Sequence, residues 1–101
     1  MIKHIVMWNF KDEAEGNSKE TNKQTAKKIL LNLVGVVPGI QKLEVGLKEA
    51  TSPADNNDVV LVSEFKTWAD LQSYAIHPEH LKVGTFIKSV ASSRAAVDYE
   101  F

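Results

Sequence analysis

The stretch YAIHPEHLKVG, from Tyr74 to Gly84, places two histidines three residues apart, directly after a tyrosine. A histidine with a pKa near neutrality can take a proton from a carbon next to a carbonyl group. A tyrosine hydroxyl can hydrogen-bond to the oxygen that becomes negative in that step, or protonate it. These residue types can therefore move protons without a metal ion or an organic cofactor, and we expect neither.

The same stretch has more ordinary interpretations. His77 precedes Pro78, and the residue before a proline is pushed out of the helical region, so His77 can be a junction between two helices. Tyr74 lies at helical spacing from Leu71, as core tyrosines do. His77 and His80 are spaced as a metal-binding pair, but the intervening proline and the lack of a clear third ligand argue against a metal site.

Composition limits the class of protein. A chain of 101 residues, 44% apolar and 25% charged, predicts a single globular domain over residues 1–101. A formal net charge of -1 without a basic cluster predicts no nucleic-acid or membrane partner. The absence of cysteine excludes disulfides and thiol nucleophiles. With a strand-like N-terminus and no apolar run near the ~18 residues of a membrane span, we expect a cytoplasmic protein.

The patterning predicts a strand, a helix, two strands, a broken helix and a last strand. The expected strands are Ile2–Phe10, Ile40–Lys48, Val59–Phe65 and Arg94–Phe101, and the expected helices are Lys19–Val34, a segment capped by Thr67, and a segment from Pro78 to Val90. This order predicts an α+β fold: a ferredoxin-like four-stranded antiparallel sheet with the helices on one face. Because two strands are apolar on both faces, the bare face should pack against a second copy, which predicts a homodimer.

The topology brings two more residues toward the YAIHPEH stretch. The first and last strands are antiparallel neighbours, so His4 should lie beside Asp98. If both face the helices, the Asp98 carboxylate can accept a hydrogen bond from an imidazole and fix its tautomer. The candidate catalytic residues are therefore His80, Tyr74, His4 and Asp98. A hydrogen-bonded interior histidine remains an equally ordinary interpretation of His4.

Four segments resemble the stress-responsive A/B barrel, or Dabb, domain family: MIKHIVMWNFK, VPGIQKLEVG, YAIHPEHLKVG and AVDYEF. They span essentially the whole chain in the family's order, and the YxxHPxH pattern is the most specific of them. The resemblance implies a dimeric α/β barrel in which two ferredoxin-like sheets pair through their bare faces. It implies first a dimeric domain of undetermined activity, since many members have none assigned, and some are plant stress proteins.

The family also includes a plant polyketide cyclase. In that enzyme the tyrosine and the last histidine of YxxHPxH are the catalytic pair, which here are Tyr74 and His80, and His4 and Asp98 match residues of its pocket. The resemblance thus implies, as an alternative, a cofactor-independent cyclase-like or isomerase-like enzyme acting on a small apolar or polyketide-like molecule.

The wider group of dimeric α/β barrels holds cofactor-free quinol monooxygenases and haem-degrading enzymes. Asn9, Trp68 and a histidine make a monooxygenase-like or haem-related protein a further alternative. The YxxHPxH pattern favours the Dabb family over this one.

Overall fold

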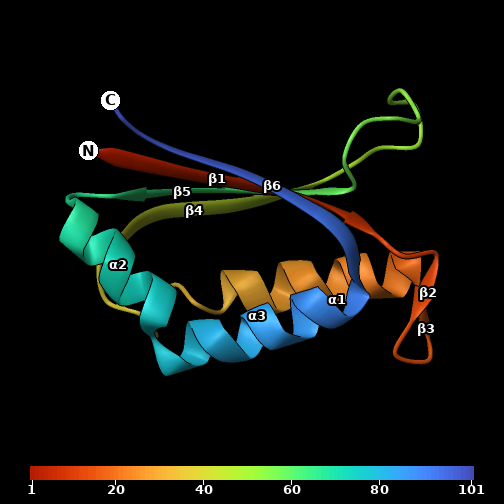
Figure 1. The fold of residues 1–101 in the computed structure, drawn as a ribbon, viewed down its shortest axis with the longest axis horizontal. Helices are drawn as coiled ribbons and strands as arrows, with labels where there is room; N and C mark the ends of the chain where they lie inside the picture. The colour runs from red at the N-terminus through yellow and green to blue at the C-terminus, as the bar shows by residue number, and fades with distance from the viewer.

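The computed structural model describes residues 1–101 and places three helices on one face of a four-stranded antiparallel sheet (Figure 1). The strands lie in the order β4-β5-β1-β6, which confirms the ferredoxin-like α+β architecture. The strands of the sheet are β1 (Ile2–Phe10), β4 (Ile40–Leu47), β5 (Val59–Phe65) and β6 (Ala91–Glu100); the helices are α1 (Lys19–Leu31), α2 (Trp68–Ile76) and α3 (Pro78–Val90).

The core lies between the sheet and the helices. Alternate side chains of the two central strands point into it, which is the period of an extended chain. The buried residues of these strands are Ile2, Val6, Trp8 and Phe10 on β1 and Val59, Leu61, Ser63 and Phe65 on β5. The helices close the core with buried side chains that include Leu30, Tyr74 and Val90. His4 lies on the same face of β1 as these buried residues, so its side chain points toward the helices.

The start of the first helix matches the prediction, whereas its end does not. Ser18 caps α1 by accepting a hydrogen bond from the Thr21 N–H. The helix stops at Leu31 and not at Val34, because the following residues form tighter turns in which the Val34 N–H donates to the Leu31 carbonyl. Gly35 then adopts φ 86°, a left-handed conformation that glycine tolerates.

Two further boundaries differ from the prediction. A short hairpin of β2 (Glu13–Ala14) and β3 (Asn17–Ser18) occupies the segment predicted as a polar connection. The last strand begins at Ala91, three residues before the predicted Arg94, because α3 passes directly into β6. Its pairing with β1 shifts register next to Phe10, and this irregularity breaks the clean alternation on which the prediction depended.

The second face of the sheet carries no helix (Figure 1). Its apolar side chains form adjacent rows across three strands, since Ile5 pairs with Val62 and Val97, and Met7 pairs with Val60. All five are partly or largely exposed in the single chain. None of the helices is both long and apolar enough to cross a membrane.

Candidate active site

The junction between α2 and α3 positions the YAIHPEH residues. His77 has an extended conformation (φ -63°, ψ 136°), as expected before Pro78, and separates the two helices. Its Nδ1 accepts a hydrogen bond from the Glu79 N–H at 3.1 Å and so caps α3. The interpretation of His77 as a junction residue is confirmed, and its ring does not belong to the cluster described below.

Tyr74 is the centre of the candidate site. Its side chain is completely buried, with ring centroids 5.1 Å from Phe65, 4.3 Å from His80 and 6.1 Å from His4. Its hydroxyl is buried and makes no hydrogen bond with the protein. Burial raises the pKa of Tyr74 to about 12, so the phenol keeps its proton at neutral pH. A buried hydroxyl without a partner is unfavourable, and a ligand's acceptor atom would satisfy it.

His80 packs on Tyr74 from the first turns of α3. Its Nδ1 lies 3.0 Å from the Ala75 carbonyl oxygen. A carbonyl oxygen can only accept, so Nδ1 carries the hydrogen, and Nε2 of the neutral ring keeps its lone pair. Burial lowers the pKa of His80, and the charges of His4, Arg94 and His77 lower it further against the raising effect of the Ala75 carbonyl. His80 is therefore a neutral base at pH 7, with its free nitrogen unused by the backbone.

His4 and Asp98 form the sheet side of the cluster, as the topology predicted. They are direct register partners on β1 and β6, and His4 Nδ1 lies 2.5 Å from the Asp98 carboxylate. The carboxylate accepts, so Nδ1 of His4 carries the hydrogen. The structure thus brings all four predicted residues together, from β1, α2, α3 and β6.

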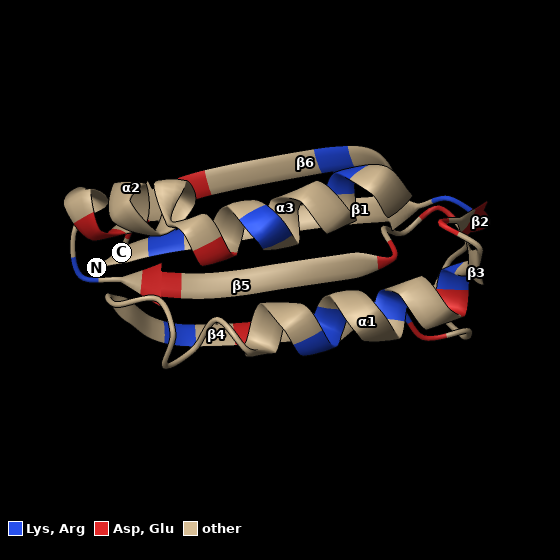
Figure 2. Ribbon diagram, turned by 90° about the horizontal axis from the view of Figure 1, so that it is seen from below, with Lys and Arg blue, Asp and Glu red and all other residues tan.

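The cluster opens along one edge of the sheet. β6 is an edge strand, and from Ser92 onward all of its residues are exposed, including those that face the helices. In the view from the helix side, β6 runs beside α3 with no helix in front of most of its length (Figure 2). Two surface hollows lie elsewhere: about 400 Å³ beside the loop between β4 and β5, and about 310 Å³ between α1 and α3. Neither of these hollows is lined by the four candidate residues.

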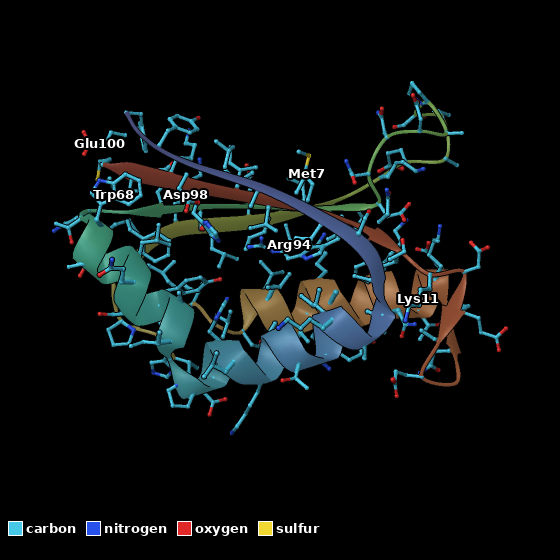
Figure 3. The ribbon with its side chains drawn as sticks, viewed as in Figure 1. Met7, Lys11, Trp68, Arg94, Asp98 and Glu100 are labelled. Atoms are coloured by element: carbon cyan, nitrogen blue, oxygen red, sulfur yellow. The ribbon has the colours of Figure 1, made fainter.

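Arg94 is a further residue near the cluster, and the sequence did not single it out. It lies on the same face of β6 as Asp98, and both side chains are on the helix side of the strand, whereas Met7 projects from the opposite face of the sheet (Figure 3). Its charge is among those that lower the pKa of His80. Arg94 and Asp98 are four residues apart, so the alternation of a strand places them on one face. This spacing was visible in the sequence and could have identified Arg94 as a residue near the site.

The residues of the monooxygenase-like or haem-related alternative do not assemble. Asn9 alternates with the buried residues of β1 and lies on the opposite face from His4. Trp68 is 45% exposed, and its Nε1 donates to a Glu100 carboxylate oxygen at 3.0 Å. The structure therefore gives these two side chains no shared site with a histidine.

Comparison with known proteins identifies the family. The family described as the Stress Responsive A/B Barrel Domain, Dabb, matches residues 2–101. The chain belongs to the Dabb family. It is 28% identical to olivetolic acid cyclase of Cannabis sativa over 100 residues, which cover 97% of this chain and 94% of the cyclase. It is 27% identical to the stress-response A/B barrel domain-containing protein DABB1 of Arabidopsis thaliana, spanning 98% of this chain but only 46% of that protein.

Among solved structures, this Dabb chain resembles a dimeric protein of unknown function with a ferredoxin-like fold from Bacteroides fragilis. The two share 35% sequence identity and superpose with a TM-score of 0.87, over 99% of this chain and 95% of the other. The sequence resemblance to the Dabb family and the ferredoxin-like fold are thereby confirmed, and a structural relative of this fold is dimeric.

Proposed function

We propose that this Dabb protein is a cofactor-independent, cyclase-like enzyme that removes a proton next to a carbonyl group of a small molecule. The observation that carries the proposal is the buried Tyr74 hydroxyl, which has no hydrogen-bond partner in the protein and lies beside the neutral base His80. The similarity to olivetolic acid cyclase, at 28% identity over nearly the whole of both chains, supports a cyclase-like reaction.

Each residue has one role in the proposed step. Tyr74 donates its O–H to the substrate carbonyl oxygen, and its raised pKa keeps that proton in place. His80 Nε2 takes a proton from the adjacent carbon; the C–H bond breaks, and its electron pair moves toward the carbonyl oxygen. In a substrate with a second carbonyl, the resulting enolate carbon can attack that group and close a ring.

The His4–Asp98 pair is the supporting part of the site. Asp98 accepts a hydrogen bond from His4 Nδ1 and so fixes the orientation of the His4 ring on the sheet side of Tyr74. Because the Tyr74 hydroxyl is buried, the packing around it must open before a substrate can reach it. The exposed flank at β6 is the side on which this opening disturbs the fewest packed residues.

Hydrogen–deuterium exchange tests this chemistry without knowledge of the natural substrate. Methyl 7-oxooctanoate, a neutral ketone, is incubated with the protein in D₂O, and exchange next to the ketone is followed by proton NMR. We expect the wild type to accelerate exchange, and His80→Ala and Tyr74→Phe to lose about 100-fold of that acceleration. His77→Asn is the matched control, because it removes a neighbouring histidine while keeping a helix cap. Equal rates for the wild type and both site variants would contradict the proposal.

A second candidate is binding without turnover, in a stress-related protein. Complete burial of the Tyr74 ring favours it, because a side chain packed in this way also stabilises the core. Cells lacking this gene distinguish the two candidates. Full rescue of their phenotype by a His80→Ala, Tyr74→Phe double variant would favour binding over catalysis.

We also infer that the working unit is a homodimer joined through the bare face of the sheet. The partly exposed rows of Ile5, Met7, Val60, Val62 and Val97 support this, because an apolar face of this kind is unfavourable in water. The dimeric relative from Bacteroides fragilis, 35% identical, supports it as well.

Light scattering tests the dimer. We expect a dimer mass at micromolar concentration and a monomer mass for Val62→Glu, which places a charge in the centre of the face. Leu81→Glu changes an apolar residue that is 55% exposed on α3, and should leave the dimer intact. A wild-type monomer would refute the inference.

A further inference from the structure

Arg94 is the only arginine in the chain, and it stands on the helix side of the exposed strand β6 (Figure 3). Some of the lysines have carboxylate partners: Lys3 pairs with Glu64, and Lys19 and Lys48 pair with Asp58. Arg94 forms no ion pair and no side-chain hydrogen bond with the protein. Its planar guanidinium presents donors in a fork that matches both oxygens of a carboxylate, which makes it the side chain best suited to hold one.

The position of Arg94 relates it to the candidate site. Its charge is close enough to His80 to help lower the pKa of that ring, after the larger effect of burial. Along β6 it is four residues from Asp98, or about 13 Å of strand, and its own long side chain closes part of that distance. A molecule that contacts Tyr74 at one end can therefore reach the guanidinium with a chain of several bonds.

The charges along this flank favour one orientation of an acidic ligand. The Asp98 carboxylate accepts a hydrogen bond from His4 and offers no donor, so it cannot hold a carboxylate placed near the Tyr74 end. At the other end, Arg94 is the one cation on the helix side of β6. A ligand with a neutral carbonyl group and a distant carboxylate fits both ends.

We propose that the site takes an oxo-acid, whose carbonyl oxygen accepts from Tyr74 and whose carboxylate, several bonds away, binds Arg94. The carbonyl end of this assignment rests on the proposed function, whereas the acid end rests on Arg94 alone. The family resemblance implied a small apolar or polyketide-like ligand, and the proposal adds a carboxylate to it.

A matched pair of probes tests the acid end. Binding of 7-oxooctanoate and of methyl 7-oxooctanoate, which differ only in the charge of the acid group, is measured by calorimetry at low salt. We expect the wild type to bind the acid about tenfold more tightly than the ester, the effect of one charge-assisted contact. Arg94→Gln should bind both probes equally, and Arg94→Lys should keep part of the preference. Lys88→Gln is the control, since it removes the same charge from an exposed position on α3.

The possible results separate this proposal from the proposed function. Equal binding of acid and ester by the wild type, a preference that survives in Arg94→Gln, or no binding of either probe would overturn the oxo-acid assignment. A preference that depends on Arg94, without any exchange of the protons next to the ketone, would support the assignment and contradict the catalytic role. Exchange of the ester's protons without preferential binding of the acid would support the catalytic role and contradict the oxo-acid assignment.

Discussion

Two clusters of polar side chains lie at opposite ends of β1, and they differ in whether their buried polar groups have partners. At the far end from His4, Asp58 is almost fully buried, and every contact it needs is present: the Phe10 N–H at 2.8 Å, Lys19 at 3.4 Å and Lys48 at 3.6 Å. Burial alone would raise the pKa of Asp58, but the Phe10 N–H and the charges of Lys19 and Lys48 outweigh it, and the pKa is lowered. At the near end, the Tyr74 hydroxyl is equally buried and has no partner.

The difference shows which cluster serves the fold and which is available to a ligand. A buried polar group with all of its hydrogen bonds fixes the chain around it, and here it joins β1, α1 and the loop before β5. A buried polar group without a partner stabilises the fold no more than an apolar group of similar shape would. The four predictions below test this contrast.

Removal of Asp58 should have the largest effect. Asp58→Ala leaves the Phe10 N–H without its acceptor and two lysines without their counter-charge, so we expect a loss of about 3 kcal/mol in the free energy of unfolding. Urea denaturation measures it. Asp55→Ala, in the exposed part of the same loop, should change stability by less than about 0.5 kcal/mol. Similar losses in both variants would remove the contrast between the two clusters.

His77 tests whether the tyrosine end also contains a structural contact. His77→Ala removes the side-chain cap of α3 and should lower stability by about 1 kcal/mol, whereas Asn, a good capping residue, should recover most of it at the same position. The comparison is made by thermal or urea unfolding at constant pH. If Ala and Asn behave alike, the hydrogen bond to Glu79 does not stabilise the junction.

His80 should give a smaller, pH-dependent effect, because its ring is only partly buried. Its folded-state pKa lies below the ordinary 6.5, so the unfolded chain binds a proton first as the pH falls. Folding stability should therefore decrease as the pH falls below 6.5, and the decrease should stop once the pH is below the folded-state pKa of His80. Above pH 6.5, the titration of His80 should not affect stability. The wild type should lose more stability over this range than His80→Asn. If the stability of the wild type and of His80→Asn changes in parallel with pH, burial does not lower the pKa of His80.

Tyr74→Phe should have the smallest effect on stability. Phenylalanine keeps the packing on Phe65 and removes only an unpaired hydroxyl, so the free energy of unfolding should stay within about 0.5 kcal/mol or rise. Ser63→Ala is the informative comparison: Ser63 is also fully buried, but its hydroxyl donates to the His4 carbonyl, so about 1 kcal/mol should be lost. A larger loss for Tyr74→Phe than for Ser63→Ala would mean that the Tyr74 hydroxyl has a partner in the folded protein.

The sequence predicted most of the fold, because strong apolar periodicity marks its elements. The bounds of β1 and β5 match the prediction, since both strands are rich in apolar residues and end at clear polar breaks. The end of α1 and the start of β6 were misplaced. At both points the outcome depends on turns and pairing register, which the residues alone do not specify.

The candidate site was predictable only where strand pairing or a motif fixed it. The proximity of His4 and Asp98 follows from the topology and is confirmed. In contrast, nothing in the loop sequence distinguishes Asp58, which is buried, from Asp55, which is exposed. The missing partner of the Tyr74 hydroxyl was equally beyond prediction, because it depends on the packing of residues from several elements.

The antiparallel pairing of β1 with β6 has a mechanical consequence. The first and last residues lie at the same corner, where the Phe101 N–H donates to the Met1 carbonyl (Figure 1). A force that separates the two ends would peel the strands apart one residue pair at a time, from Ile2 with Glu100 inward. The pair of His4 with Asp98 is the third in that ladder. Under tension, therefore, the candidate site should come apart early, while the Asp58 cluster at the other end still holds the sheet together.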